Sequence, residues 1–124
     1  MKFNPKLRQD IERYKDYAII VEGKKDIAAM NHLGFYRVYA LHKTGVSLRE
    51  GVEEMVGFFD KKDKVCILTD FDRRGKQLYM KVKEILQELG VRLDSSLRGI
   101  LIKARVSHIE GFDKFIEKVD NIGR

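Results

Sequence analysis

Hydrophobic residues in this chain occur either as short unbroken runs or at helical spacing. The unbroken runs at residues 17–21 and 65–68 both end in acidic residues. Runs of this length without polar alternation are typical of strands buried on both faces, which occur in parallel sheets covered by helices. Further strands are predicted at residues 35–41, which are rich in aromatic and β-branched side chains, and at residues 99–104. Residues 91–98 are predicted to form a loop.

Helical spacing, with hydrophobic residues three or four positions apart, marks the segments between these runs. It occurs in residues 7–14, 27–33, 48–59, 78–89 and 112–119. Two of these helices carry start signals, because Asn4 with Pro5 is suited to a helix start and Ser47 with Glu50 forms a capping box. Strands that alternate with helices predict a Rossmann-like α/β fold, a three-layer sandwich of about four mainly parallel strands with helices on both faces.

The composition predicts one domain. The chain has 124 residues, of which 44% are hydrophobic, enough for a single core. Residues 1–16 are expected to form an N-terminal helix, 17–111 the core and 112–124 a C-terminal helix. With no long apolar segment and no leader, the protein is expected to be cytoplasmic and without membrane contact. The single cysteine, Cys66, lies in a predicted strand and is interpreted as a core residue, so no disulfide or cysteine zinc site is expected.

Three acidic residues follow the two unbroken runs. Glu22 comes directly after the first run, and Asp70 and Asp72 come just after the second. If the strands are parallel neighbours, these carboxylates converge at one edge of the sheet, where ligands bind in open α/β sheets. Carboxylates that share a point require a cation or a raised pKa, and oxygen ligands suit Mg²⁺, with Mn²⁺ as a second candidate. The alternative is that these acids are only helix caps and turn residues.

Basic residues are concentrated after the acidic pair. The whole chain carries a net charge of +6, and residues 73–105 alone contain nine basic and three acidic residues. Arg73 and Arg74 fall at the start of a predicted helix, where the helix dipole favours an anion, so a phosphate held there would explain them. The alternative is a solvated helix face without a partner. The absence of a Gly-x-x-x-x-Gly-Lys-Ser/Thr loop excludes an ordinary P-loop ATPase.

These motifs together resemble a known family. A strand running into residues 21–26 (VEGKKD) and a later strand running into residues 69–75 (TDFDRRG) are similar to the Toprim domain of topoisomerases, bacterial-type primases and small nucleases that mature 5S ribosomal RNA. The similarity covers roughly residues 17–111 and is greatest to the small stand-alone members, primase-like or nuclease-like. It implies a Toprim fold, magnesium at the aspartates and phosphodiester chemistry on RNA or DNA.

The resemblance assigns roles to particular residues. Glu22, Asp70 and Asp72 are the expected catalytic and metal-binding residues, with Glu22 either a ligand or a general acid/base. The residues expected to bind the phosphates of nucleic acid are Lys24, Lys43, Arg73 and Arg74. Past the last predicted strand, His108 and Glu110 are candidates to line the site.

Three functional hypotheses remain open on the sequence. The first is an Mg²⁺-dependent enzyme acting on nucleic-acid phosphodiesters, as a nuclease or nucleotidyl transferase. The second is a non-catalytic adaptor that binds metal and nucleic acid within an RNA- or DNA-processing assembly. The third is a flavodoxin-like phosphoacceptor, which would require a pair of acids after the first strand, where only Glu22 stands.

Overall fold

Four parallel strands form the sheet at the centre of the fold. The computed structural model describes residues 6–42, 44–106, 108–114, 116 and 117. The strands are β1 (Ala18–Val21), β2 (Val38–Ala40), β3 (Lys64–Ile67) and β4 (Arg92–Leu93), in the spatial order β2-β1-β3-β4. Every neighbouring pair is parallel, and Ile19 aligns with Val38 on one side and Cys66 on the other.

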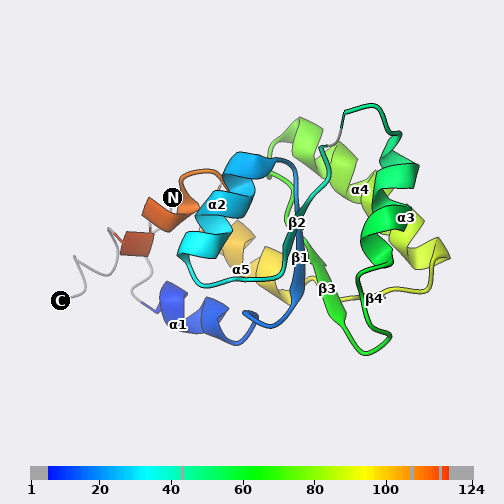
Figure 1. The fold of residues 1–124 in the computed structure, drawn as a ribbon. Helices are drawn as coiled ribbons and strands as arrows, with labels where there is room; N and C mark the ends of the chain where they lie inside the picture. Colours follow the sequence, from blue (N-terminus) through cyan, green and yellow to red (C-terminus); the bar gives the residue numbers. More distant parts are fainter. Residues whose placement is uncertain (1–5, 43, 107, 115, 118–124) are drawn as a thin grey trace.

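Helices cover both faces of this sheet, which confirms the predicted three-layer α/β fold. The main helices of the described residues are α1 (Leu7–Glu12), α2 (Lys24–His32), α3 (Leu48–Val56), α4 (Arg73–Glu88) and α5 (Ser96–Lys103), and residues 112–114, 116 and 117 are also helical. Figure 1 shows α1, α2 and α5 on one side of the strands and α3 and α4 on the other. Ser47 is the N-cap of α3, as its place in the predicted capping box requires, and its Oγ accepts a hydrogen bond of 3.1 Å from Glu50 N–H.

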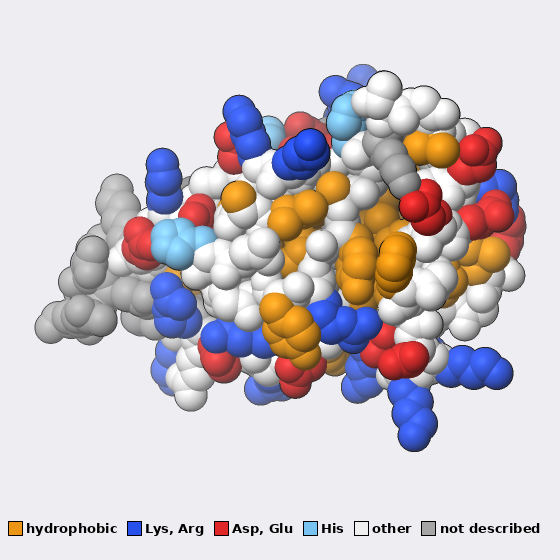
Figure 2. Space-filling model, in the orientation of Figure 1, with side chains coloured by type: hydrophobic (Ala, Val, Ile, Leu, Met, Phe, Trp, Pro, Cys, Tyr) orange, Lys and Arg blue, Asp and Glu red, His pale blue; other side chains and the backbone are white. Residues whose placement is uncertain are grey.

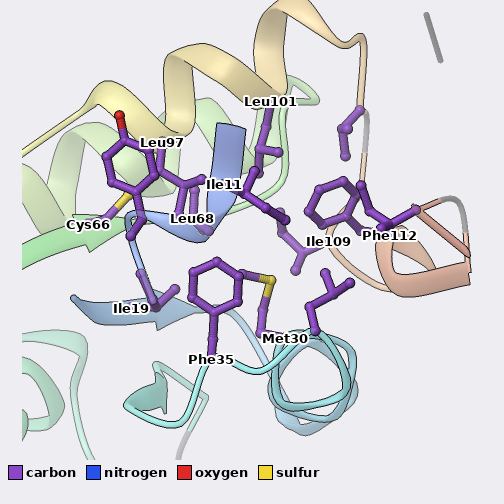
Figure 3. Packing of buried hydrophobic residues seen from close by; sticks show 14 of the residues in the cluster. Ile11, Ile19, Met30, Phe35, Cys66, Leu68, Leu97, Leu101, Ile109 and Phe112 are labelled. Carbon is purple, nitrogen blue, oxygen red and sulfur yellow. The ribbon is translucent and has the colours of Figure 1, made fainter. Parts of the chain in front are cut away.

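Alternate residues of the central strands face two separate cores. Ile19 and Cys66 point to the side of α1, α2 and α5, where they pack with Phe35 and Leu97 (Figure 3). The adjacent residues, such as Ile20, point to the side of α3 and α4. Since both faces are covered, unbroken apolar runs are the pattern that these strands require. Burial raises the pKa of the Cys66 thiol to about 12, in keeping with its interpretation as a core residue.

The sequence-based assignment of the fourth strand was wrong. Residues 99–104, predicted as a strand, belong mostly to α5 (Ser96–Lys103), and the short β4 (Arg92–Leu93) lies within the segment predicted as a loop. Residues 100–102 are three consecutive aliphatic residues, and so short an apolar run does not distinguish a strand from a buried helical turn. The pairing of β4 with the start of β3 depends on tertiary contacts instead.

The strand order creates a crevice between β1 and β3. The chain leaves β1 for β2 on one side and then crosses to β3 on the other, so the connections diverge between these two strands. In open α/β sheets, ligands bind beyond the carboxyl ends of the strands at such a point. Glu22 follows β1 and Asp70 follows β3, so the fold brings these residues to the two sides of the crevice.

The edge strand β2 lies on the face of the molecule seen in Figures 1 and 2. Hydrophobic side chains gather in the middle of that face (Figure 2), and the residues lining a small hollow there include Tyr39 and Phe58. No helix in the described part of the chain has the length and apolar character needed to cross a membrane. The predicted start signal at Asn4 and Pro5, and the end of the predicted C-terminal helix, lie outside the described residues.

Candidate metal and nucleic-acid site

Glu22 and Asp70 are in direct contact although 48 positions separate them. Glu22 Oε2 accepts a hydrogen bond of 2.7 Å from Asp70 N–H. Because β1 and β3 are paired, with Leu68 N–H bonded to Ile20 O at 2.7 Å, the residues just beyond the two strands are held side by side. The convergence of these acids expected from the sequence is therefore present, and the Glu22 carboxylate is oriented by the backbone of the Asp70 turn.

Asp70 and Asp72 are each oriented by a backbone N–H group. Asp70 Oδ1 accepts from Ile109 N–H at 3.0 Å, and Asp72 Oδ1 accepts from Gly75 N–H at 2.7 Å. The second bond makes Asp72 the N-cap of α4. The sequence had suggested helix capping only as the alternative to metal binding. The signal was available, since Asp is among the preferred residues immediately before a helix.

Asp72 also contacts His108. The Oδ2 atom of Asp72 lies 3.5 Å from His108 Nε2, and donor atoms of Asp70, Asp72 and His108 all lie within 4.8 Å of one another. Among the described residues, this is the group of three that could hold a metal ion, and Glu22 is not part of it. The expectation that Asp70 and Asp72 share a point is met, whereas a ligand role for Glu22 stays a prediction.

Two acids at the crevice, Glu22 and Asp26, have raised pKa values. Burial raises the pKa of Glu22, the N–H of Asp70 opposes that shift, and the Asp70 carboxylate adds to it. Burial likewise raises the pKa of Asp26, whose Oδ2 accepts a hydrogen bond of 3.0 Å from Gly23 N–H at the start of α2. Asp26 lies in the first turn of this helix. It is a buried acid close to the partly buried Glu22 and lines the same groove.

A groove of about 1000 Å³ opens above the crevice. Its lining combines acidic, basic and aliphatic side chains, and the residues are Glu22, Gly23, Lys24, Lys25, Asp26, Leu41, His42, Val46, Leu48, Asp70, Arg74, Leu78, His108, Glu110 and Gly111. The candidates His108 and Glu110 therefore do line the site. The groove is large and partly basic, so it can accommodate an extended anionic ligand rather than an ion alone.

The basic residues expected at phosphates have different positions. Lys24 and Arg74 line the groove, whereas Arg73, the first residue of α4, does not. Lys43 lies outside the described residues. Lys25 and Glu110 also line the groove, and Lys25 Nζ lies 3.8 Å from Glu110 Oε1.

Arg98 is buried, which corrects its sequence-based assignment to a basic surface stretch. Only 5% of the residue is exposed, and its guanidinium lies 4.6 Å from the centre of the Phe71 ring and 4.2 Å from that of Tyr79. Its Nη1 donates a hydrogen bond of 2.8 Å to Thr69 O, just before Asp70. Burial lowers the pKa of Arg98. The sequence around Arg98 does not show whether its side chain is buried or exposed, because an arginine next to a buried leucine in a helix occurs in both situations.

Comparison with known proteins identifies the family. A model of the Toprim domain matches residues 17–100. This chain belongs to the Toprim domain family. It is similar to a protein named UPF0292 from Methanocaldococcus jannaschii, 31% identical over 121 residues that cover 91% of each chain. It is also similar to a UPF0292 protein from Thermoplasma volcanium, 34% identical over 85 residues that cover 68% of this chain and 69% of the relative.

A solved structure shares the Toprim fold. The chain superposes with a TM-score of 0.70 on a structure described as a putative protein from Aquifex aeolicus, with 28% sequence identity over 85% of this chain and 94% of the other. The names of these relatives state no activity. Membership of the Toprim family indicates a function that depends on a divalent metal and involves nucleic acid, and the Asp70, Asp72 and His108 cluster agrees with metal binding.

Proposed function

We propose that this Toprim protein performs metal-dependent phosphodiester chemistry on nucleic acid, as a nuclease or a nucleotidyl transferase. The observation that carries the proposal is the convergence of Glu22 and Asp70 across the β1–β3 crevice, with Asp72 beside them. These acids come from segments far apart in sequence and meet at the point of the sheet where ligands bind. A groove with basic side chains lies over them.

The donors at this point suit a divalent metal. Asp70 and Asp72 would hold the ion, because each is already oriented by a backbone N–H bond to one of its oxygens. When bound, such an ion supplies Lewis-acid polarisation of a phosphate oxygen. Without a cation, two neighbouring carboxylates repel each other, so their side-by-side placement is itself an argument for one.

Glu22 is proposed as the proton carrier. Its Oε2 atom is engaged by Asp70 N–H, which fixes the direction of the carboxylate and leaves Oε1 as the atom to take a proton from an attacking hydroxyl or give one to a departing oxygen. Lys24 and Arg74, which line the groove, would bind phosphate oxygens and position the scissile bond. Each of these roles is assigned to a residue already in the groove.

The test compares Glu22→Gln with Asp70→Asn. Glutamine keeps an oxygen that can accept from Asp70 N–H but cannot carry the proton, so we expect turnover to fall by about 10²–10⁴ while metal-dependent binding of nucleic acid persists. Asp70→Asn should lose both metal binding and turnover. The measurements are cleavage or extension of end-labelled RNA and DNA, single-stranded and duplex, beside a binding assay at matched Mg²⁺ or Mn²⁺ concentration.

A second candidate is the non-catalytic adaptor, and one observation favours it. Glu22 and Asp72 both have structural roles, the first bonded to the Asp70 backbone and the second capping α4, so the fold could retain these acids without catalysis. Wild-type protein that binds nucleic acid with metal yet leaves every substrate unchanged would establish this alternative. Equal loss of binding and turnover in Glu22→Gln would instead make Glu22 a metal ligand.

A further inference from the structure

His108 is held at the acidic cluster by its neighbours in the chain. Val106 is buried, and its N–H donates a hydrogen bond of 3.1 Å to Leu101 O. Ile109 is fully buried, points into the core with the labelled residues of Figure 3, and donates its N–H to Asp70 Oδ1 at 3.0 Å. Two described residues near His108 are held in this way, one on each side along the chain, and His108 Nε2 lies 3.5 Å from Asp72 Oδ2.

The donor atoms of the three side chains are nearly as close together as one ion requires. Metal bonds to carboxylate oxygen and imidazole nitrogen are about 2.0–2.2 Å long, so two donors on opposite sides of an ion lie about 4 Å apart. The donor atoms of Asp70, Asp72 and His108 lie within 4.8 Å of one another, and the contact between Asp72 Oδ2 and His108 Nε2 is 3.5 Å. The limit of 4.8 Å slightly exceeds this separation, so the side chains would move closer together on binding one ion.

Resting on the metal-dependent function proposed above, we propose that His108 is a ligand of the divalent ion held by Asp70 and Asp72. The imidazole makes this site prefer a first-row transition ion such as Mn²⁺ to Mg²⁺. Mg²⁺ takes oxygen ligands in a strict octahedral arrangement, whereas imidazole nitrogen suits transition ions. The competing explanation is that His108 only forms an ion pair with Asp72, in which case the ion has oxygen ligands alone.

Pulsed electron paramagnetic resonance on the Mn²⁺-loaded protein distinguishes these explanations, because a ligating histidine nitrogen modulates the Mn²⁺ signal. We expect nitrogen modulation in the wild type and its loss in His108→Ala. The matched control is His42→Ala, since His42 lines the same groove but is outside the three-residue cluster, and the modulation should persist there. Calorimetric titration should show Mn²⁺ affinity at least about tenfold weaker in His108→Ala, with Mg²⁺ affinity unchanged.

The outcomes separate this proposal from the function on which it rests. Wild-type protein that binds Mn²⁺ without nitrogen modulation, or His108→Ala that retains the modulation, overturns the role of His108. If Mg²⁺ supports cleavage in that case, the proposed function still stands. A wild type that binds neither Mn²⁺ nor Mg²⁺ overturns both. Because the first measurement is made on the unchanged chain, the proposal is testable even if His108→Ala fails to fold.

Discussion

At the scale of single residues, Arg98, Thr69 and Gly75 support the turn on which Asp70 and Asp72 lie. The buried Arg98 donates a hydrogen bond to the Thr69 carbonyl, and its guanidinium lies over the rings of Phe71 and Tyr79. Gly75 allows the first turn of α4 to pass over the Asp70 backbone, and Thr69 Oγ1 donates to Gly75 O at 2.7 Å. The turn carrying both aspartates is therefore packed between the end of β3 and the start of α4.

Gly75→Ala tests this close approach. A Cβ atom at position 75 would lie 2.0 Å from Asp70 O, so the backbone of the turn or the helix must shift. We expect a loss of about 2–3 kcal/mol in the free energy of unfolding, typical of overpacking, and loss of the rise in melting temperature on adding metal. Urea unfolding and metal-dependent melting curves measure both quantities.

Gly99→Ala is the matched control. Gly99 is also a helical glycine, but a Cβ there would meet no atom within 4 Å. Alanine should raise the free energy of unfolding by about 0.5–1 kcal/mol through its higher helix propensity and leave the metal response unchanged. If Gly75→Ala behaved like this control, the turn would not depend on the close contact.

At the scale of elements, an ion pair links the segments that enter β2 and β3. Arg37 Nη1 and Nη2 donate to Asp63 Oδ1 and Oδ2 at 2.9 and 2.6 Å, and these strands flank β1 on its two sides. The Arg37 guanidinium lowers the pKa of Asp63 from 3.8 to about 2. The pair lies at the amino ends of β2 and β3, and the candidate site lies at their carboxyl ends. The pair therefore contributes to stability rather than to chemistry.

This ion pair predicts a pH dependence of stability. Because the pKa of Asp63 is lower in the folded state than in the unfolded state, its contribution is complete above about pH 4 and is lost as the pH falls toward 2. Asp63→Asn should remove that part of the acid sensitivity and cost up to about 1 kcal/mol near neutral pH. Urea midpoints between pH 2 and 7 measure both effects.

Arg37→Gln serves as the reciprocal control. It should remove the same acid-dependent contribution, and the double variant Arg37→Gln/Asp63→Asn should cost less than the sum of the two single changes because they break one interaction. Strict additivity would show that the two side chains do not stabilise the protein through each other. Neither change should alter metal binding, since the pair lies at the amino ends of the strands.

At the scale of the whole molecule, the excess positive charge is not confined to the groove. On the face shown in Figure 2, Lys and Arg side chains are scattered among acidic and hydrophobic ones. Of the basic residues in positions 73–105, Arg98 is buried and Arg74 lines the groove. The phosphate contacts are expected where basic side chains line the groove, at Lys24 and Arg74.

Salt dependence of nucleic-acid binding tests this placement. Each phosphate contact releases about one counterion, so Lys24→Ala/Arg74→Ala should reduce the slope of log affinity against log salt by about 2. The control, Lys61→Ala/Lys62→Ala, removes the same charge from exposed positions at the amino end of β3 and should keep the wild-type slope. Equal effects of the two double variants would mean that net charge, and not the groove, determines binding.

The sequence by itself determined the order of most elements and the identity of the central acids. Unbroken apolar runs identified β1 and β3 because strands buried on both faces show that local pattern. Helical spacing identified α3 and α4 in the same way. Glu22, Asp70 and Asp72 were recognisable because each follows such a strand, and parallel strands bring their carboxyl ends to one edge.

Where the local sequence pattern fitted more than one structure, only the tertiary structure decided which of them formed. The aliphatic residues 100–102 became part of a helix because α5 packs against the core beside Leu68, a contact that the local pattern does not encode. Arg98 and His108 have partners that the local pattern does not reveal, since Arg98 donates to Thr69, 29 positions before it, and His108 contacts Asp72. The physical reason is that burial, ion pairing and ligand geometry depend on which distant segments meet, whereas periodicity reports only the immediate neighbours.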